Sequence, residues 1–186
     1  MNYALIRKND IANGHGVRVS LFVSGCRHHC KGCFNPETWN FSYGKPFTDE
    51  TIEEILQALK PDYIIGLSLL GGEPFEPENQ EVLLKLTSLV RKVYPSKSIW
   101  CYSGFPFSLL SAGKIGASET CLALLGNIDV LVDGTFKEEL KDASLIFRGS
   151  SNQNIIDVPT SLKEGKMVIL EGKWERKMGS GDINEI

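Results

Sequence analysis

The sequence lacks any apolar run long enough to cross a membrane. Its most apolar run, residues 63–70, falls far short of the about 20 residues that a transmembrane helix needs. The first residues, MNYALIRK, also lack the apolar stretch of a signal peptide. We therefore expect a cytoplasmic protein that does not associate with membranes.

An excess of charge of either sign is also missing. The 186 residues contain 20 Lys and Arg against 23 Asp and Glu, a formal net charge of -3. Nucleic acids and anionic membranes attract strongly basic proteins, so we expect neither as a partner. Hydrophobic residues (42%) and charged residues (23%) occur as in ordinary soluble proteins. The length suits one main domain with a sizeable core.

The cysteines do not form a set that could pair completely, because there are five of them. Three fall close together, between positions 26 and 33. Without a secretion signal, this pattern argues against a disulfide framework. Reduced thiols point to metal binding or catalysis, and a short cluster of them favours metal. A His–carboxylate signature for acid–base catalysis is not evident.

Predicted strands and helices alternate along the chain, with no internal repeat. A helix is expected from an N-cap at Thr48 to Pro61, with Ile52, Ile55, Leu56 and Leu59 on one apolar face. A second ends before Pro95, and Ser118 is expected to cap a short third. Buried strands are predicted at residues 17–23, 63–70, 98–102 and 128–132. Such alternation predicts an α/β fold with a mostly parallel sheet. About four to six units are too few for a closed eight-fold barrel, so we expect a partial, open βα barrel.

Four loops are expected to meet at one end of this sheet, because each follows a parallel strand. The cysteine loop follows the first strand and Gly71-Gly72-Glu73-Pro74 the second. Ser103-Gly104 follows the third and Asp133-Gly134 the fourth. The sequence therefore predicts a single site built from all four.

Cys26, Cys30 and Cys33 have the spacing C-x3-C-x2-C. A loop with this spacing can bind a cubic iron–sulfur cluster through three thiolates, whereas electron-transfer clusters of this kind normally use four. Three ligands leave one iron open to a substrate. Zinc is the competing interpretation, completed by His28 or His29, but no second ligand pair follows at the usual spacing. For both histidines we expect solvent exposure or a place on a mildly electropositive rim.

The residues around these cysteines resemble those of the radical S-adenosylmethionine activating enzymes. The resemblance runs through Gly16–Cys26 and Cys33–Trp39, and returns in Gly71-Gly72-Glu73-Pro74 and in the segment FRGSSNQ at 147–153. It is greatest to the members that activate anaerobic ribonucleoside-triphosphate reductase, and it covers nearly the whole chain. One departure is His15, which stands where the family commonly has proline.

The resemblance implies a radical S-adenosylmethionine domain in residues 1–160, followed by a C-terminal strand or extension with a flexible tail in residues 161–186. It implies a [4Fe–4S] cluster that reductively cleaves S-adenosylmethionine to a 5′-deoxyadenosyl radical, which installs a glycyl radical on the reductase. A low-potential donor such as flavodoxin or ferredoxin would supply the electron. Alternatives are another glycyl-radical partner, such as pyruvate formate-lyase, and a non-catalytic metal-binding or electron-carrier module. The implied cofactor-binding residues are Gly32, Cys33, Phe34, Gly71, Gly72 and Glu73, with Cys26, Cys30 and Cys33 as metal ligands.

Several residues keep two interpretations at this level. Phe34 either borders the adenosyl group or packs into the core, and Asp133 either lines the pocket or caps a turn. Arg148 pairs with a carboxylate of this chain or meets the partner protein. Cys101 and Cys121 are expected to be ordinary core cysteines. A basic rim is expected to orient docking on a folded partner; its members are Arg27, His28, His29 and Lys31.

Overall fold

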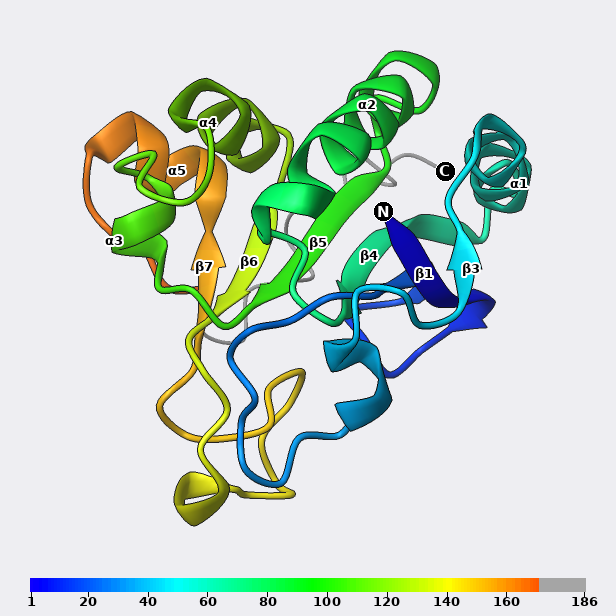
Figure 1. Cartoon of the computed structure of the whole chain (residues 1–186). Coiled ribbons are helices and arrows are strands. Elements are labelled where there is room, and N and C mark those ends of the chain that lie inside the picture. Colours follow the sequence, from blue (N-terminus) through cyan, green and yellow to red (C-terminus); the bar gives the residue numbers. More distant parts are fainter. Residues whose placement is uncertain (171–186) are drawn as a thin grey trace.

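The computed structural model describes residues 1–170, in which helices pack on a seven-stranded sheet (Figure 1). The strands are β1 (Asn2–Asp10), β2 (Val17–Val23), β3 (Lys45–Pro46), β4 (Ile64–Gly71), β5 (Ser98–Ser103), β6 (Val130–Asp133) and β7 (Asn154–Asp157). The α-helices are α1 (Asp49–Leu59), α2 (Pro77–Val93), α3 (Phe107–Leu110), α4 (Ser118–Gly126) and α5 (Val158–Glu164). Two short 3-10 helices, η1 (Pro36–Trp39) and η2 (Glu138–Leu140), lie in the loops.

The sheet has a parallel centre and antiparallel edges. Its order is β3-β1-β2-β4-β5-β6-β7, and the pairs β2–β4, β4–β5 and β5–β6 are parallel. β1 runs antiparallel to β2 and β3, and β7 antiparallel to β6. Within residues 1–170 the edge strands β3 and β7 do not pair with each other, so the sheet is open. The predicted α/β class with an unclosed sheet is confirmed.

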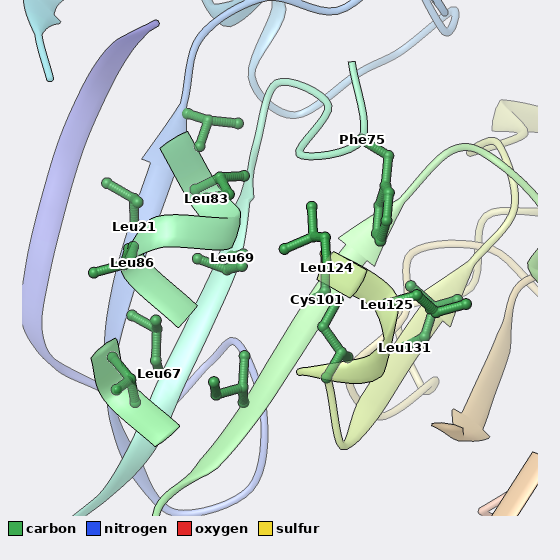
Figure 2. Packing of buried hydrophobic residues seen from close by; sticks show 14 of the residues in the cluster. Leu21, Leu67, Leu69, Phe75, Leu83, Leu86, Cys101, Leu124, Leu125 and Leu131 are labelled. Atoms are coloured by element: carbon green, nitrogen blue, oxygen red, sulfur yellow. The ribbon is translucent and has the colours of Figure 1, made fainter. Parts of the chain in front are cut away.

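The hydrophobic core lies between the sheet and its helices (Figure 2). Leu21, Leu67 and Leu69 point from the central strands toward Leu83 and Leu86 of α2. Leu124 and Leu125 of α4 cover the neighbouring part of the sheet. Burying such side chains contributes about 1.5–3 kcal/mol each. Cys101 and Cys121 are fully buried in this core, as predicted.

The ends of α1 agree with the sequence. Thr48 is the N-cap and forms a capping box with Thr51. Phe47, just before the cap, packs on the same core that buries Ile52. The predicted cap of α4 is off by one residue, because Ala117 is its N-cap and Ser118 its first residue.

The other face of the sheet carries a buried arginine near the amino ends of the strands. The Arg18 guanidinium is fully buried and donates to Ser68 Oγ (2.7 Å) and Ser98 Oγ (2.9 Å). It also lies over the Trp100 ring, 5.5 Å from the centroid. Burial lowers the pKa of Arg18 to about 9. Side chains of the protein therefore fill this part of the second face of the sheet.

The start of the predicted C-terminal extension packs against the sheet. The backbone N–H of Leu170 donates to Ile155 O (2.8 Å), and Leu170 is buried beside Trp100. The remainder of the extension, residues 171–186, lies outside the described residues, so the predicted boundary at residue 160 stays a prediction. No helix among residues 1–170 combines the length and apolar character needed to cross a membrane.

Candidate functional site

A cavity of about 460 Å³ lies where the parallel strands end, and its volume is typical of small-molecule sites. The cysteine loop, Gly71 to Glu73, Ser103-Gly104 and Gly134 all contribute to its wall. The predicted convergence of four strand ends on one site is confirmed. Further lining residues come from β1, from β5 and from the loop 134–153, among them Arg7, Tyr102, Phe136, Phe147, Arg148 and Gln153.

The cysteine loop is held by backbone hydrogen bonds to η1. Gly25 N donates to Thr38 O (2.8 Å), and Cys26 N donates to Trp39 O (3.2 Å). Gly25 has a φ of +97°, which favours glycine at the point where the chain leaves β2. The loop thus brings Cys26, Cys30 and Cys33 to the same cavity.

Three thiols on one cavity wall are donors of the kind that hold iron–sulfur clusters. Among residues 1–170 no three Cys, His, Asp or Glu side chains are grouped so that they could hold one metal ion. In a cubic cluster each thiolate binds a different iron, so the thiols can lie further apart. Asn35 N donates to Cys33 Sγ (3.4 Å), and hydrogen bonds to sulfur are one of the ways proteins tune such clusters.

Burial makes two of the thiols, those of Cys26 and Cys30, harder to ionise. Burial raises the pKa of Cys26 to about 11, with the charge of Glu73 adding to the effect. Burial likewise raises the pKa of Cys30. Iron in such clusters binds thiolates, so a cluster held by these cysteines would release these protons as it binds.

The Glu73 carboxylate joins three loops. It is 1% exposed. Its Oε1 accepts from Phe75 N (2.8 Å) and Ser103 Oγ (2.9 Å). Its Oε2 accepts from Gly104 N (2.7 Å) and lies 3.1 Å from His28 Nε2. Four partners occupy this carboxylate. Glu73 therefore lines the cavity mainly as a structural residue that connects the loops of its wall.

His28 is not on an exposed rim, so that prediction is wrong. Its side chain is 17% exposed and packs edge-on against Phe105, with ring centroids 4.4 Å apart. The hydrogen bond to Glu73 raises the pKa of His28, against the opposing effect of burial. The His28 ring therefore links the cysteine loop to the strand ends.

The glycines at the end of β4, Gly71 in the strand and Gly72 after it, lie where side chains do not fit. Gly71 has a φ of +103°. A Cβ on Gly72 would lie 2.6 Å from Gly25 O, next to the first cysteine. The glycine pair therefore lets the β4 loop approach the backbone of the cysteine loop.

The loop 134–153 extends beside the cysteine loop at the carboxyl end of the sheet (Figure 1). Phe136 packs against Phe34 (centroids 5.2 Å apart), and a Cβ on Gly149 would lie 3.0 Å from both rings. Phe34 is 62% exposed and lines the cavity, so it is not a core residue. Sequence reasoning did not single out Phe136, which no motif marks.

The expected basic rim is also wrong, because its cations are paired. Arg27 forms ion pairs with Glu76 and Glu78, and Lys31 with Glu138 (3.1 Å). The exposed His29 is stacked on Trp39.

Asp133 is absent from the cavity wall. Its carboxylate accepts from Phe107 N (2.7 Å), at the start of α3, and from Asn154 Nδ2 (2.9 Å). The pocket interpretation of Asp133 is therefore wrong, and the carboxylate binds the start of α3 and β7 rather than the turn that follows it.

Two buried polar atoms around the cavity have no hydrogen-bond partner within residues 1–170. They are the Tyr102 hydroxyl and Trp39 Nε1. Buried polar groups are nearly always paired. These two therefore fit a cavity that takes a polar ligand.

The site matches a known class of iron–sulfur protein. Residues 12–156 match the family model described as "4Fe-4S single cluster domain". This match places the chain in the class of proteins that contain a single 4Fe-4S cluster domain.

Curated relatives show to which family within this class the chain belongs. The chain is 42% identical over 157 residues to the anaerobic ribonucleoside-triphosphate reductase-activating protein of Pasteurella multocida, covering 83% of this chain and 96% of the relative. Proteins of the same name match at 43% in Escherichia coli K12 (82% and 96% covered) and at 40% in Enterobacteria phage T4 (83% and 93% covered). The chain belongs to the family of anaerobic ribonucleoside-triphosphate reductase-activating proteins.

Proposed function

We propose that this protein is a radical S-adenosylmethionine enzyme that installs a glycyl radical on an anaerobic ribonucleoside-triphosphate reductase. The observation that carries the proposal is the position of Cys26, Cys30 and Cys33 on one cavity wall with Gly71 and Gly72. The names of the relatives support the choice of reductase as partner. An open sheet with a parallel centre supports a partial barrel of this type.

A [4Fe–4S] cluster held by the three cysteines would supply one electron to S-adenosylmethionine. A carbon–sulfur bond would then break to give methionine and a 5′-deoxyadenosyl radical. This radical would take hydrogen from a glycine. The chain's own residues orient the reactants and exclude water. Gly71 and Gly72 line the cavity, and a backbone carbonyl group there would accept from the ammonium group. Phe34 and Phe136 form an aromatic wall suited to an adenosyl group.

The partner glycine needs an accessible cavity. Because the edge strands β3 and β7 do not pair with each other within residues 1–170, we expect a loop of another protein to enter from the open side of the sheet. Since the cations of the cysteine loop are paired, we expect this docking to depend little on salt.

The first test is cleavage of S-adenosylmethionine. Cluster-reconstituted protein, incubated anaerobically with dithionite, should form equal amounts of methionine and 5′-deoxyadenosine. Cys30→Ala is the matched control and should form neither. A wild-type protein that carries a reducible cluster but cleaves nothing would support the electron-carrier alternative instead.

A further inference from the structure

Three large apolar side chains are exposed on the loops around the cavity. Phe34 of the cysteine loop is 62% exposed, and Ile146 and Leu140 of the loop 134–153 are 57% and 38% exposed. Phe34 also lines the cavity, so it lies where the cavity meets the solvent. Groups of exposed apolar side chains mark binding surfaces, whereas single ones are ordinary. We call these three residues the apolar rim.

Ring contacts connect the two loops that carry the apolar rim. The Phe34 ring packs against Phe136 (centroids 5.2 Å apart), and Lys141 Nζ lies 5.3 Å from the centroid of the same Phe34 ring. Lys141 directly follows Leu140, and Leu140 O accepts from Ser151 N (2.9 Å). Phe34 and the segment around Leu140 therefore belong to one surface.

Ile146 lies at the edge of the cavity. Its two chain neighbours, Leu145 and Phe147, line the cavity, and the Phe147 ring packs edge-on against Trp100 (centroids 5.3 Å apart). Ile146 itself does not line the cavity and is exposed to solvent. The loop therefore follows the edge of the cavity and leaves the Ile146 side chain in solvent.

The longer of the two loops is held in place by its own side chains. Gln153 Oε1 accepts from Gly149 N (2.9 Å) and Ser150 N (3.1 Å), and Gln153 Nε2 donates to Gly134 O (2.9 Å) at the end of β6. Arg148 Nη1 donates to Gln153 O (2.7 Å). Little further ordering is therefore needed when a partner binds to this loop, which favours affinity.

The charges in the segments that carry the apolar rim cancel. Residues 31–34 and 137–146 contain three lysines and three acidic residues, which are Lys31, Lys137, Lys141, Glu138, Glu139 and Asp142. Arg148 and the cluster cysteines belong to the cavity wall and not to these segments. An exposed apolar surface without net charge suits an apolar protein surface, whereas nucleic acid requires a basic one.

We propose that the apolar rim is the docking surface for the anaerobic ribonucleoside-triphosphate reductase, which covers it with apolar side chains that flank its glycine loop. This inference rests on the proposed function, which supplies the partner. The glycine must reach the cavity, and Phe34 belongs both to the cavity wall and to the rim. A chain that enters the cavity therefore passes across the rim, and burial of the rim side chains stabilises the complex.

The test measures binding of the cluster-loaded protein to the reductase by anaerobic biolayer interferometry. The rim variant, Leu140→Ser combined with Ile146→Ser, should raise Kd by about 10- to 100-fold, as expected when central apolar contacts of an interface are truncated. Cleavage of S-adenosylmethionine without the reductase should stay unchanged, because neither residue lines the cavity. A higher concentration of reductase should restore the maximal rate of glycyl-radical formation, which separates lost docking from lost chemistry.

The matched control replaces two exposed apolar residues away from the rim. Leu122→Ser combined with Val93→Ser changes side chains of α4 and α2 that are 41% and 48% exposed, and no residue of these two helices lines the cavity. This control should bind the reductase as tightly as the wild type does. Ile146→Ser alone should raise Kd by about 3- to 10-fold, and it carries the test should the rim variant fail to fold.

The remaining outcomes separate this inference from the proposed function. An unchanged Kd in the rim variant, an equal loss in the control, or a wild type that does not bind the reductase overturns the inference. A wild-type dimer in sedimentation that the rim variant dissociates also overturns it, because a second copy then covers the rim. A wild type that binds the reductase through the rim but forms no glycyl radical on it overturns the proposed function alone.

Discussion

Replacing Glu73 by glutamine should destabilise the protein strongly, although the change is nearly isosteric. The carboxylate is 1% exposed and accepts from two backbone N–H groups, Phe75 N and Gly104 N, as well as from Ser103 Oγ. An amide has one acceptor oxygen, so one side of the network would face an NH₂ group. A buried donor left unpaired costs about 1–3 kcal/mol, and the remaining bonds lose their charge assistance.

We therefore expect Glu73→Gln to lower the free energy of unfolding by about 2–4 kcal/mol, which corresponds to about 4–16 °C in Tm for a chain of this length. The assay is urea unfolding of the cluster-free protein, followed by circular dichroism under reducing conditions. Glu78→Gln is the matched control, because this carboxylate is half-exposed and bonds to Arg27 on the surface. It should cost less than about 1 kcal/mol. A Glu73→Gln variant as stable as Glu78→Gln would refute the structural role of the Glu73 carboxylate.

The remaining predictions concern the cluster, the glycine pair and acid stability. Replacing any one of the three cluster cysteines by Ala should abolish the cluster, seen as lost iron and lost visible absorbance, whereas Cys101→Ala should keep it; iron missing from intact Cys101→Ala would reveal an overlooked ligand. Gly72→Ala should reduce iron content as well as S-adenosylmethionine binding, because its Cβ would meet Gly25 O at a cost of about 1–3 kcal/mol; Gly126→Ala, which meets nothing within 4 Å, is its control. Burial alone would raise the pKa of Asp10, but hydrogen bonds outweigh it and hold the pKa below 3.8. The stability that the Asp10 carboxylate contributes is therefore present above that pH and is lost as the pH falls through the lowered pKa. Asp10→Asn should thus be less stable than wild type in urea unfolding at pH 6, and a difference that does not shrink between pH 6 and pH 3 would contradict this assignment.

The central strands and the larger helices could be predicted because their side chains are buried in regular patterns. The expected strand at residues 63–70 is β4, Ile64–Gly71, and the helix stopped by Pro95 is α2, Pro77–Val93. Both have a continuous apolar run or face that only burial explains. Convergence of the strand ends followed from their parallel pairing.

The edges of the sheet were missed for the opposite reason. β1 is largely exposed or half-buried, and its sequence NYALIRKND carries little alternation. β7 is four residues long, and its antiparallel pairing depends on how the preceding loop turns back. Local sequence does not encode such pairing.

Within the site, the cysteine spacing could be read directly, but the partners of charged residues could not. Arg27 pairs with residues of the start of α2, about fifty positions away. His28 meets Glu73 across two loops. Contacts of this kind depend on the assembled fold. The cysteine loop therefore looks basic in the sequence, although acidic residues from other elements neutralise it in the structure.

The most direct test of the proposed function is the transfer of hydrogen from the reductase. Reduced, cluster-loaded protein is mixed anaerobically with S-adenosylmethionine and an anaerobic ribonucleoside-triphosphate reductase that carries deuterium on the glycine α-carbon. The proposal predicts a glycyl radical by electron paramagnetic resonance and deuterium in the 5′-deoxyadenosine formed. A glycyl radical with no deuterium in that product, or no radical at all, would contradict it.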